Sequence, residues 1–435
     1  MSEADRTTEA DVTAARRALA ATPPMGWNSW DCFGASVTEA EVIANAEFMA
    51  EHLLPHGWDT IVVDIQWYEA DPGLTDYQTV SDPVLDAWGR QLPAPNRFPS
   101  AAGGSFRPLA DRIHALGLRF GLHMMRGIPR KAVEFALPVL GTDVTAADIA
   151  DRSSVCPWNP DNFGIDHSRP GADGFYDSQV AQFAEWGVDF VKLDDVLYPP
   201  IEQAEIEAYS RAIDRSGRPM ILSLSPGRQL SSAYLDTLRA TAQMWRISDD
   251  LWDEWSQVLE QFQRAARWAR HQIPGAWADA DMLPLGRLGI RAHVGADRMS
   301  RLTLDEQRTL ISLWCMVRSP LMFGGHLPDT PAETLALVTN DALIEVLHAS
   351  TGGREIVRDH SLVVWAAELD GDAVRAVFWL GEASTTLDVH LADLGCDAAK
   401  QAEDLWSGAA VAVENQAVRL EIPAHGARVI RFPRV

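Results

Sequence analysis

The feature that most constrains this chain is an alternation of short apolar runs with segments of helical periodicity between about residues 24 and 350. Short apolar runs bounded by turn residues predict buried strands, and apolar residues that recur every three to four positions predict helices. A helical segment follows each run, and this order predicts a parallel (β/α)8 TIM barrel. The eight runs are 25–29, 61–63, 118–122, 188–193, 220–224, 242–247, 275–278 and 320–323.

The segments between these runs predict the outer helices of the barrel. Gly57, Gly117, Gly187 and Gly217 each stand shortly before a predicted strand, where a helix commonly ends on a left-handed residue. This placement agrees with a helix that stops and a strand that starts a few residues later. The predicted helices are 38–53, 107–116, 173–186, 201–216, 231–238, 251–270, 304–317 and 331–347.

Near Gly352 the pattern changes to short strands separated by polar or glycine turns, which predicts a C-terminal antiparallel β-sandwich domain. We therefore divide the chain into an N-terminal extension (1–21), a (β/α)8 barrel (22–351) and a β domain (352–435). The strands of this last domain are expected at 361–366, 373–380, 385–389, 410–413, 418–422 and 427–432.

Charge and composition exclude several kinds of partner. The formal net charge of −24 would repel nucleic acid and an anionic membrane surface, so neither is expected as a partner. The first 21 residues hold no apolar stretch typical of a signal peptide, so a cytoplasmic location is expected. The four cysteines are scattered and lack metal-binding spacing, which predicts no metal site. Homo-oligomer formation is left open.

Polar residues after the predicted strands are the candidates for chemistry, because a parallel barrel carries its active site at the carboxyl ends of its strands. Several are carboxylates, and the chain has 16 Trp against 6 Tyr. Paired carboxylates with a stacking Trp are the equipment of glycoside hydrolysis. Lys192 and Asp194 point to the same side of one strand, so the lysine favours the ionised aspartate. The candidates are Trp30, Asp64, His123, Lys192, Asp194, Ser225, Arg246, Asp250 and Asp281.

Five segments together resemble glycoside hydrolase family 27, the melibiase or α-galactosidase family. They read TPPMGWNSW (22–30), GVDFVKLD (187–194), WRISDD (245–250), WADADML (277–283) and the stretch from Leu313 to Leu321. The resemblance covers the chain from residue 22 onward. It implies a retaining, exo-acting α-galactosidase that acts on a small-molecule or oligosaccharide glycoside and needs no metal or organic cofactor.

The resemblance also implies individual roles. Asp194 would be the nucleophile, and Asp250 would be the general acid and then the general base. Trp30 would border the sugar, while Asp64 and Lys192 would hold its hydroxyls. Arg246, Asp281 and His123 would line the same pocket.

Departures from the family pattern leave the substrate open. Ile65 replaces the second of two adjacent aspartates, and Ser225 begins a loop unlike the usual Cys-Glu-Trp type. The loop 124–129 replaces a disulfide-bearing one. An α-N-acetylgalactosaminidase and a β-L-arabinopyranosidase are therefore alternatives. An alternative of another class is a barrel lyase that forms a Schiff base with Lys192. Asp194 argues against this alternative, because its charge raises the pKa of the lysine amine, and a Schiff-base lysine needs a lowered pKa.

Overall fold

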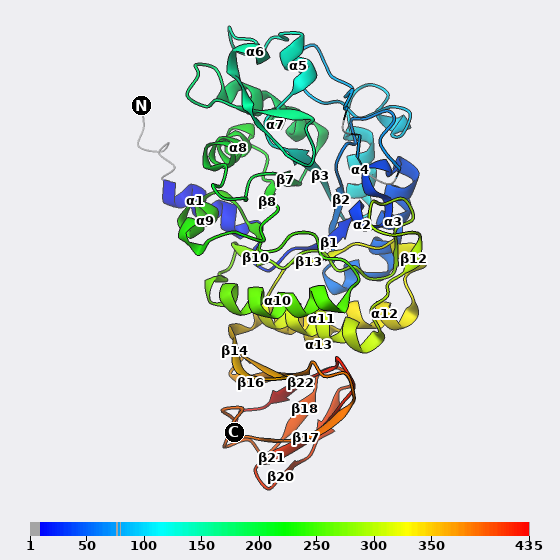
Figure 1. Ribbon diagram of the computed structural model, residues 1–435, viewed down its shortest axis with the longest axis vertical. Coiled ribbons are helices and arrows are strands. Elements are labelled where there is room, and N and C mark those ends of the chain that lie inside the picture. The colour runs from blue at the N-terminus through cyan, green and yellow to red at the C-terminus, as the bar shows by residue number, and fades with distance from the viewer. Residues whose placement is uncertain (1–8, 75–76, 79, 435) are drawn as a thin grey trace.

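The computed structural model describes residues 9–74, 77–78 and 80–434 and confirms a parallel barrel followed by a β domain (Figure 1). Each of the eight predicted apolar runs overlaps a strand of one parallel sheet, in the order β10-β9-β8-β7-β3-β2-β1-β13. A parallel bridge between Leu283 and Phe323 joins the segment after β10 to β13. The strands are β1 (Met25–Asn28), β2 (Thr60–Val63), β3 (Arg119–Met125), β7 (Phe190–Asp194), β8 (Ile221–Leu224), β9 (Met244–Arg246), β10 (Trp277–Asp279) and β13 (Leu321–Phe323).

Helices cover the outside of the sheet, and every predicted helical segment overlaps at least one of them. All four glycines named above have a positive φ, between 71° and 91°, as expected for residues that follow a helix end. The helices are α3 (Glu39–His52), α4 (Arg107–Ala115), α7 (Asp173–Trp186), α8 (Gln203–Ser216), α9 (Leu235–Thr241), α10 (Trp255–Trp268), α11 (Leu304–Val317), α12 (Ala332–Val338) and α13 (Asp341–Ala349).

Three helix predictions were wrong in their bounds. The helix predicted at 231–238 begins only at Leu235 and continues to Thr241. The segment 331–347 holds two helices rather than one, because the Asn340 side chain accepts a hydrogen bond from the Leu343 amide and starts α13 afresh. The helix predicted from residue 251 begins only at Trp255. The Leu251 amide instead donates to Asp281, so the chain after β9 stays irregular until the helix begins.

A long excursion between β3 and β7 was not predicted. It contains a three-stranded antiparallel sheet in the order β4-β6-β5, with the short helices α5 (Arg130–Glu134) and α6 (Ala146–Ile149) beside it. Its strands are too short or too polar to give a period-two signal, which explains why the pattern missed them. They are β4 (Ile128–Pro129), β5 (Ala150–Val155) and β6 (Asn162–Ile165).

The C-terminal domain is a β-sandwich of a six-stranded sheet, β14-β15-β16-β22-β18-β19, and a three-stranded sheet, β17-β21-β20. The prediction missed β14 and β18, and the run 410–413 spans parts of two short strands. The largely exposed or half-buried side chains of β14 explain the first omission. The strands are β14 (Thr351–Asp359), β15 (Leu362–Leu369), β16 (Asp372–Trp379), β17 (Thr385–His390), β18 (Ala402–Asp404), β19 (Ala409–Val411), β20 (Val413–Glu414), β21 (Ala417–Ile422) and β22 (Ala427–Phe432).

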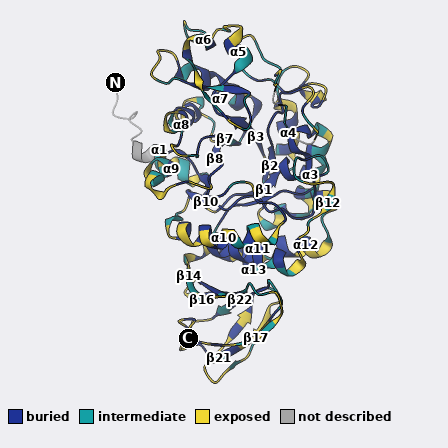
Figure 2. Ribbon diagram, viewed as in Figure 1, coloured by how far each residue is buried: buried dark blue, intermediate teal, exposed yellow. Residues whose placement is uncertain are grey.

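The β domain packs against α10 and α11, which lie between it and the barrel strands (Figure 1). The rings of Trp255 and His425 stack with centroids 4.3 Å apart, and Phe262 meets Phe378 edge-on at 5.0 Å. The Thr309 hydroxyl donates to the His425 carbonyl at 2.6 Å. Dark, buried ribbon continues across this contact in Figure 2, so the two domains share a packed interface.

The predicted N-terminal extension contains the helix α1 (Glu9–Ala18), and Ala20, two residues after the helix, contacts the barrel. The indole of Trp277 donates to the Ala20 carbonyl at 2.7 Å. All four cysteines are buried free thiols. Among the residues that the structure describes, no helix has the length and apolar character needed to cross a membrane.

Candidate active site

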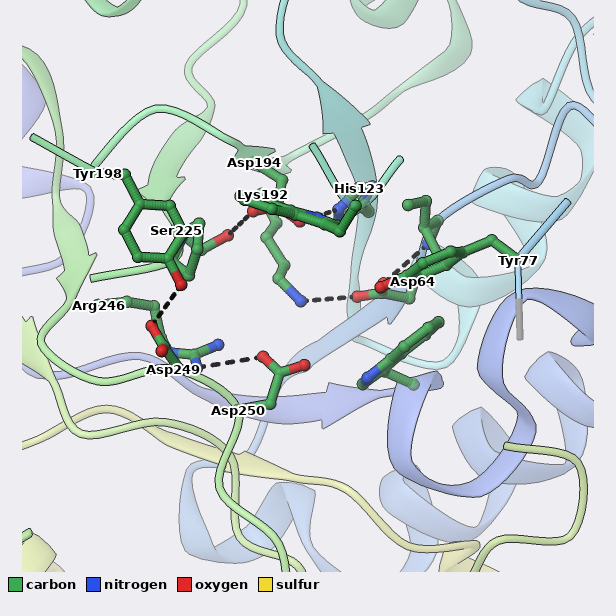
Figure 3. A pocket seen from close by; sticks show the side chains of 14 residues that line it. Asp64, Tyr77, His123, Lys192, Asp194, Tyr198, Ser225, Arg246, Asp249 and Asp250 are labelled. Atoms are coloured by element: carbon green, nitrogen blue, oxygen red, sulfur yellow. Dashed lines mark hydrogen bonds and ion pairs between the residues drawn. The ribbon is translucent and has the colours of Figure 1, made fainter. Parts of the chain in front are cut away.

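A pocket of about 360 Å³ lies at the carboxyl ends of the barrel strands (Figure 3). It brings together all the predicted site residues except Asp281. The predicted side chains lie on β3, β7 and β9 or within a few residues after β1, β2, β8 and β9, as a barrel site requires. The lining residues are Trp30, Asp64, Ile65, Tyr77, His123, Trp158, Lys192, Asp194, Tyr198, Ser225, Pro226, Arg246, Asp249 and Asp250.

The predicted nucleophile, Asp194, is the last residue of β7, and its carboxylate is held on both oxygens. Oδ1 accepts hydrogen bonds from the Ser225 hydroxyl at 3.0 Å and from the Asp195 amide at 2.8 Å. Nε2 of His123 lies 3.1 Å from Oδ2. Burial favours the neutral acid, but His123 and Lys192 outweigh it and lower the pKa of Asp194. The carboxylate is therefore ionised and fixed in orientation.

Asp64 and Lys192 form a buried ion pair beside the nucleophile. Nζ of Lys192 lies 2.9 Å from Oδ2 of Asp64, and the Asn28 amide donates to the same oxygen at 2.7 Å. Burial opposes charge on the lysine, but Asp64 and Asp194 outweigh it and raise the pKa of Lys192. In the same way, Lys192 lowers the pKa of Asp64 despite its burial. A protonated lysine between two carboxylates can donate to a sugar hydroxyl but is a poor Schiff-base nucleophile.

Asp250, the predicted acid and base, stands on the opposite side of the pocket and is much less enclosed. Its side chain is 45% exposed, whereas the Arg246 side chain below it is 3% exposed. One guanidinium nitrogen of Arg246 lies 3.3 Å from Oδ1 of Asp250. Contact with water lets this carboxyl group exchange protons during a reaction, which a general acid and base must do.

Asp281 lies behind Arg246 rather than on the pocket wall. Its Oδ1 is 2.6 Å from the Arg246 guanidinium, and its Oδ2 accepts the Leu251 amide at 2.6 Å. Burial raises the pKa of Asp281, and the charge of Arg246 opposes this. The carboxylate therefore anchors both the arginine and the segment that carries Asp250.

The turn after the nucleophile depends on a contact that sequence reasoning did not find. Asp195 adopts a left-handed conformation, with φ of 62°. Nε of Arg126 donates to the Asp195 carbonyl at 2.7 Å, and the same guanidinium lies 2.9 Å from its carboxylate. Arg126 therefore holds Asp195 from both ends, while the Asp195 amide contacts the nucleophile. We call Arg126 and Asp195 the clamp below.

The loop after β8 is shaped by a close approach to β9. A Cβ added at Gly227 would lie 1.7 Å from the Arg246 carbonyl oxygen, so only glycine fits there. The Gly227 amide donates to the Ser248 carbonyl at 3.1 Å. The Ser225 amide donates to the Leu193 carbonyl of β7 at 3.0 Å, which places Ser225 beside Asp194.

Three aromatic residues of the pocket were not predicted: Tyr77, Trp158 and Tyr198. Tyr77 stacks on Trp30 with ring centroids 5.3 Å apart, while Tyr198 donates its hydroxyl to Asp249 at 2.8 Å. All three lie in irregular segments: Tyr77 and Trp158 follow no barrel strand directly, and Tyr198 comes a full turn of chain after the end of β7. The abundance of Trp was the available signal, but it does not single out Trp158.

Ile65, the departure after β2, lines the pocket as an apolar wall. It packs with Trp30 and Met125 in one cluster of buried side chains. Asp64, directly before it, is therefore the carboxylate that this strand end contributes to the pocket lining. Among the residues that the structure describes, no group of three His, Cys, Asp or Glu side chains is arranged to hold a metal ion.

Comparison with known proteins agrees with this geometry. The family model described as alpha galactosidase A matches residues 164–348, and the one described as alpha galactosidase C-terminal beta sandwich domain matches 359–432. The solved structure of a GH27 β-L-arabinopyranosidase from Geobacillus stearothermophilus is 46% identical. It aligns over 97% of this chain and 98% of its own, with a TM-score of 0.94.

More distant similarities span the same length. A Bacillus halodurans protein, provisionally assigned as an alpha-N-acetylgalactosaminidase, is 43% identical over 95% of this chain and 97% of its own, with a TM-score of 0.85. An alpha-galactosidase of Cyamopsis tetragonoloba is 25% identical over 95% of this chain and 87% of its own.

Proposed function

Because the chain belongs to glycoside hydrolase family 27, we propose that it is a retaining, exo-acting glycosidase with Asp194 as nucleophile and Asp250 as general acid and base. The observation that carries this assignment is the placement of two unlike carboxyl groups on one pocket. One is ionised and held by three neighbours, and the other is exposed to solvent.

In the first step, a carboxylate oxygen of Asp194 attacks the anomeric carbon and forms a covalent glycosyl ester. The bond to the leaving oxygen breaks, and Asp250 donates its proton to that oxygen. The bonds from Ser225 and the Asp195 amide hold Oδ1 of Asp194, which orients the attacking carboxylate. Lys192 and Asp64 then serve to bind hydroxyl groups of the sugar beside it.

In the second step, the ionised Asp250 takes a proton from water, and the resulting hydroxide displaces Asp194 from the anomeric carbon. Two inversions at one carbon retain the configuration. The exposure of Asp250 supports this role, because water reaches that carboxylate directly. A pocket with one buried end also suits removal of a terminal sugar, which is exo action.

For the sugar itself, we propose a β-L-arabinopyranoside in preference to an α-D-galactoside. The two sugars share the same ring configuration, and only galactose carries an exocyclic hydroxymethyl group. Ile65 places an apolar wall where family members usually carry a second aspartate, so it offers no hydrogen bond to that extra hydroxyl. The 46% identical relative, which is a β-L-arabinopyranosidase, supports the same choice.

The test compares kcat/KM for the two 4-nitrophenyl glycosides. We expect the arabinopyranoside to be preferred by roughly tenfold or more, which corresponds to ~1.4 kcal/mol. Ile65→Asp should move the ratio toward the galactoside, whereas Ile65→Val, which stays apolar, should leave it nearly unchanged. Preference of the unaltered protein for the galactoside would refute the sugar assignment.

The catalytic assignment has its own test. A 2-deoxy-2-fluoro glycoside with a good leaving group should leave a labelled peptide that carries the sugar on Asp194. Proton NMR of the first product should show the same anomeric configuration as the substrate. A label on another residue, or an inverted first product, would contradict the mechanism.

A further inference from the structure

The leaving group of the substrate must lie beside Asp250, because a general acid needs to come within hydrogen-bond distance of the glycosidic oxygen. The polar residues of the pocket lining differ in how far they are exposed to solvent. Asp64, His123 and Arg246 are almost fully buried, whereas Asp250 is exposed. The terminal sugar therefore occupies the buried end, and what it is attached to passes Asp250 on its way out of the pocket.

A pair of aromatic side chains stands on this exit side. The hydroxyl of Tyr198 donates to Asp249, the neighbour of Asp250, and Figure 3 shows the ring above those two carboxylates. The Trp158 ring meets Tyr198 edge-on, with centroids 5.4 Å apart and planes 77° apart. Both rings are only half-buried and both line the pocket. We call Trp158 and Tyr198 the aromatic pair.

The Trp158 side of this pair is held by buried contacts, although it belongs to an irregular segment. The Asn159 amide donates to the Cys156 thiol at 3.4 Å, and the Asp161 amide donates to the Asn159 side chain at 3.1 Å. Asp161 in turn accepts hydrogen bonds from the Gln66 amide at 3.0 Å and from the Tyr68 hydroxyl at 2.8 Å. The segment is thus tied to the loop after β2.

The Tyr198 side is held by its hydrogen bond to Asp249. Burial and this bond raise the pKa of the Tyr198 phenol, and the charge of Asp250 adds to the effect. The phenol is therefore neutral and close to the predicted acid. A ring fixed in this way keeps its flat face available without losing side-chain entropy when a ligand arrives.

We propose that the aromatic pair is the leaving-group subsite, and that it selects leaving groups with a flat apolar ring face. The inference rests on the proposed function, because it takes Asp250 as the acid. Two chemical sources share that face: a second sugar ring, whose axial C–H groups stack on aromatic rings, and an aryl alcohol. Simple alkyl glycosides lack such a face and should be poor substrates.

The experiment uses three substrates that share one glycone and differ only in the leaving group. They are β-L-arabinopyranosyl fluoride, the 4-nitrophenyl glycoside and 3-O-β-L-arabinopyranosyl-L-arabinose. Fluoride is too small to reach the aromatic pair, so it reports the buried end alone. The variants are Trp158→Ala and Tyr198→Ala, with Tyr198→Phe keeping the ring but losing the bond to Asp249. Trp88→Ala, at a partly exposed Trp outside the pocket lining, is the matched control.

We expect Trp158→Ala and Tyr198→Ala to lower kcat/KM about 3- to 10-fold on the substrates with ring-bearing leaving groups, mainly through KM. The fluoride should stay within about twofold, a change too small to assign to one lost contact. Tyr198→Phe should fall between the unaltered protein and Tyr198→Ala. A loss confined to the disaccharide assigns a sugar leaving group, and a loss confined to the aryl glycoside assigns an aromatic one.

Two results would overturn the subsite. Equal losses on all three substrates would mean that the pair shapes the buried end instead, and no loss on any of them would mean that it binds nothing. Failure of the proposed function is distinguishable from both outcomes. In that case the unaltered protein would release no fluoride from either the arabinopyranosyl or the α-galactosyl compound.

Discussion

The two sides of the pocket differ in how far they bury and hydrogen-bond their carboxyl groups. On the β7 side, the Asp194 side chain is 16% exposed and accepts bonds from two donors at Oδ1 alone. On the β9 side, the Asp250 side chain is 45% exposed, and an Arg246 guanidinium nitrogen lies 3.3 Å from its Oδ1. The difference shows how one barrel edge can lower the pKa of one carboxyl group and leave the other in contact with water, where it can exchange protons.

The largest expected effect comes from removing the held carboxylate. Asp194→Ala should lower kcat on the order of 10⁴-fold or more, because the reaction then loses the carboxylate that forms the covalent glycosyl ester. Sodium azide should restore part of the turnover, because it fits where the carboxylate was and attacks the anomeric carbon from the same side. The glycosyl azide should therefore have inverted configuration. Normal turnover by this variant, or a retained azide product, would contradict the role of Asp194.

Removing the exposed carboxylate should produce an effect that depends on the leaving group. Asp250→Ala should lower kcat/KM for the disaccharide about 10²- to 10⁴-fold, since the sugar leaving group needs a proton. The same variant should lose far less kcat/KM on the glycosyl fluoride, because the fluoride ion departs without needing a proton. Here azide should give a product of retained configuration. Equal losses of kcat/KM on the disaccharide and the fluoride would contradict the role of Asp250 as the general acid.

The ion pair beside the nucleophile should matter for stability as well as rate. Lys192→Met leaves the Asp64 carboxylate buried without its cation, which costs about 3–5 kcal/mol of unfolding free energy. Because Lys192 lowers the pKa of Asp64, the pair stabilises the fold above the ordinary aspartate pKa, and this contribution is lost as the pH falls through the folded value.

The loss caused by Lys192→Met should therefore be largest near neutral pH and shrink toward pH 5, as Asp64 takes up a proton in the variant. Urea unfolding at the two pH values measures it. The double variant with Asp64→Asn should recover much of the stability. A loss that does not change with pH would show that lost packing, rather than charge, explains the effect.

The smallest expected effect tests the clamp. Arg126→Lys keeps the positive charge but replaces two separate guanidinium nitrogens, one on the carbonyl and one on the carboxylate of Asp195, with a single ammonium nitrogen. The Asp195 amide should then hold the nucleophile less well and the pKa of Asp194 should rise. We expect the apparent pKa on the acidic side of the kcat/KM profile to rise by about one pH unit, equivalent to ~1.4 kcal/mol. Activity is then lost at a higher pH as the solution is acidified.

His123, Lys192, Ser225 and Arg246 also face Asp194, and Arg126→Lys leaves all four in place. Glu202→Gln is the control, because Glu202 pairs with Arg126 at 3.4 Å from outside the clamp. An unchanged apparent pKa on the acidic side of the profile in Arg126→Lys would mean that the clamp does not act on the nucleophile.

Much of this arrangement could be predicted because its residues obey a simple rule. The eight strands stand out as apolar runs, and the residues after them meet at one face of the barrel. Asp64, Lys192, Asp194 and Arg246 were found in this way. What the rule cannot reach is a side chain that enters the site from an irregular segment, as Trp158 and Tyr198 do.

The clamp was missed for a related reason. Its action depends on a left-handed backbone at Asp195 and on a guanidinium from the neighbouring strand end, and neither leaves a periodic trace. Asp281 was placed on the wall by its position after β10, but the long Arg246 side chain lies between it and the cavity. Chain order predicts which strand end a residue follows, and packing decides how far its side chain reaches.

The stacking of His425 on Trp255 has an evolutionary consequence. Trp255 opens the helix that follows the Asp250 segment, so the C-terminal domain supports the very loop that carries the predicted acid. A module joined by a loose linker can be gained, lost or exchanged between enzymes without touching catalysis. This one cannot be transplanted so freely, because a replacement would have to reproduce the face that meets α10 and α11, and the two parts should be inherited together.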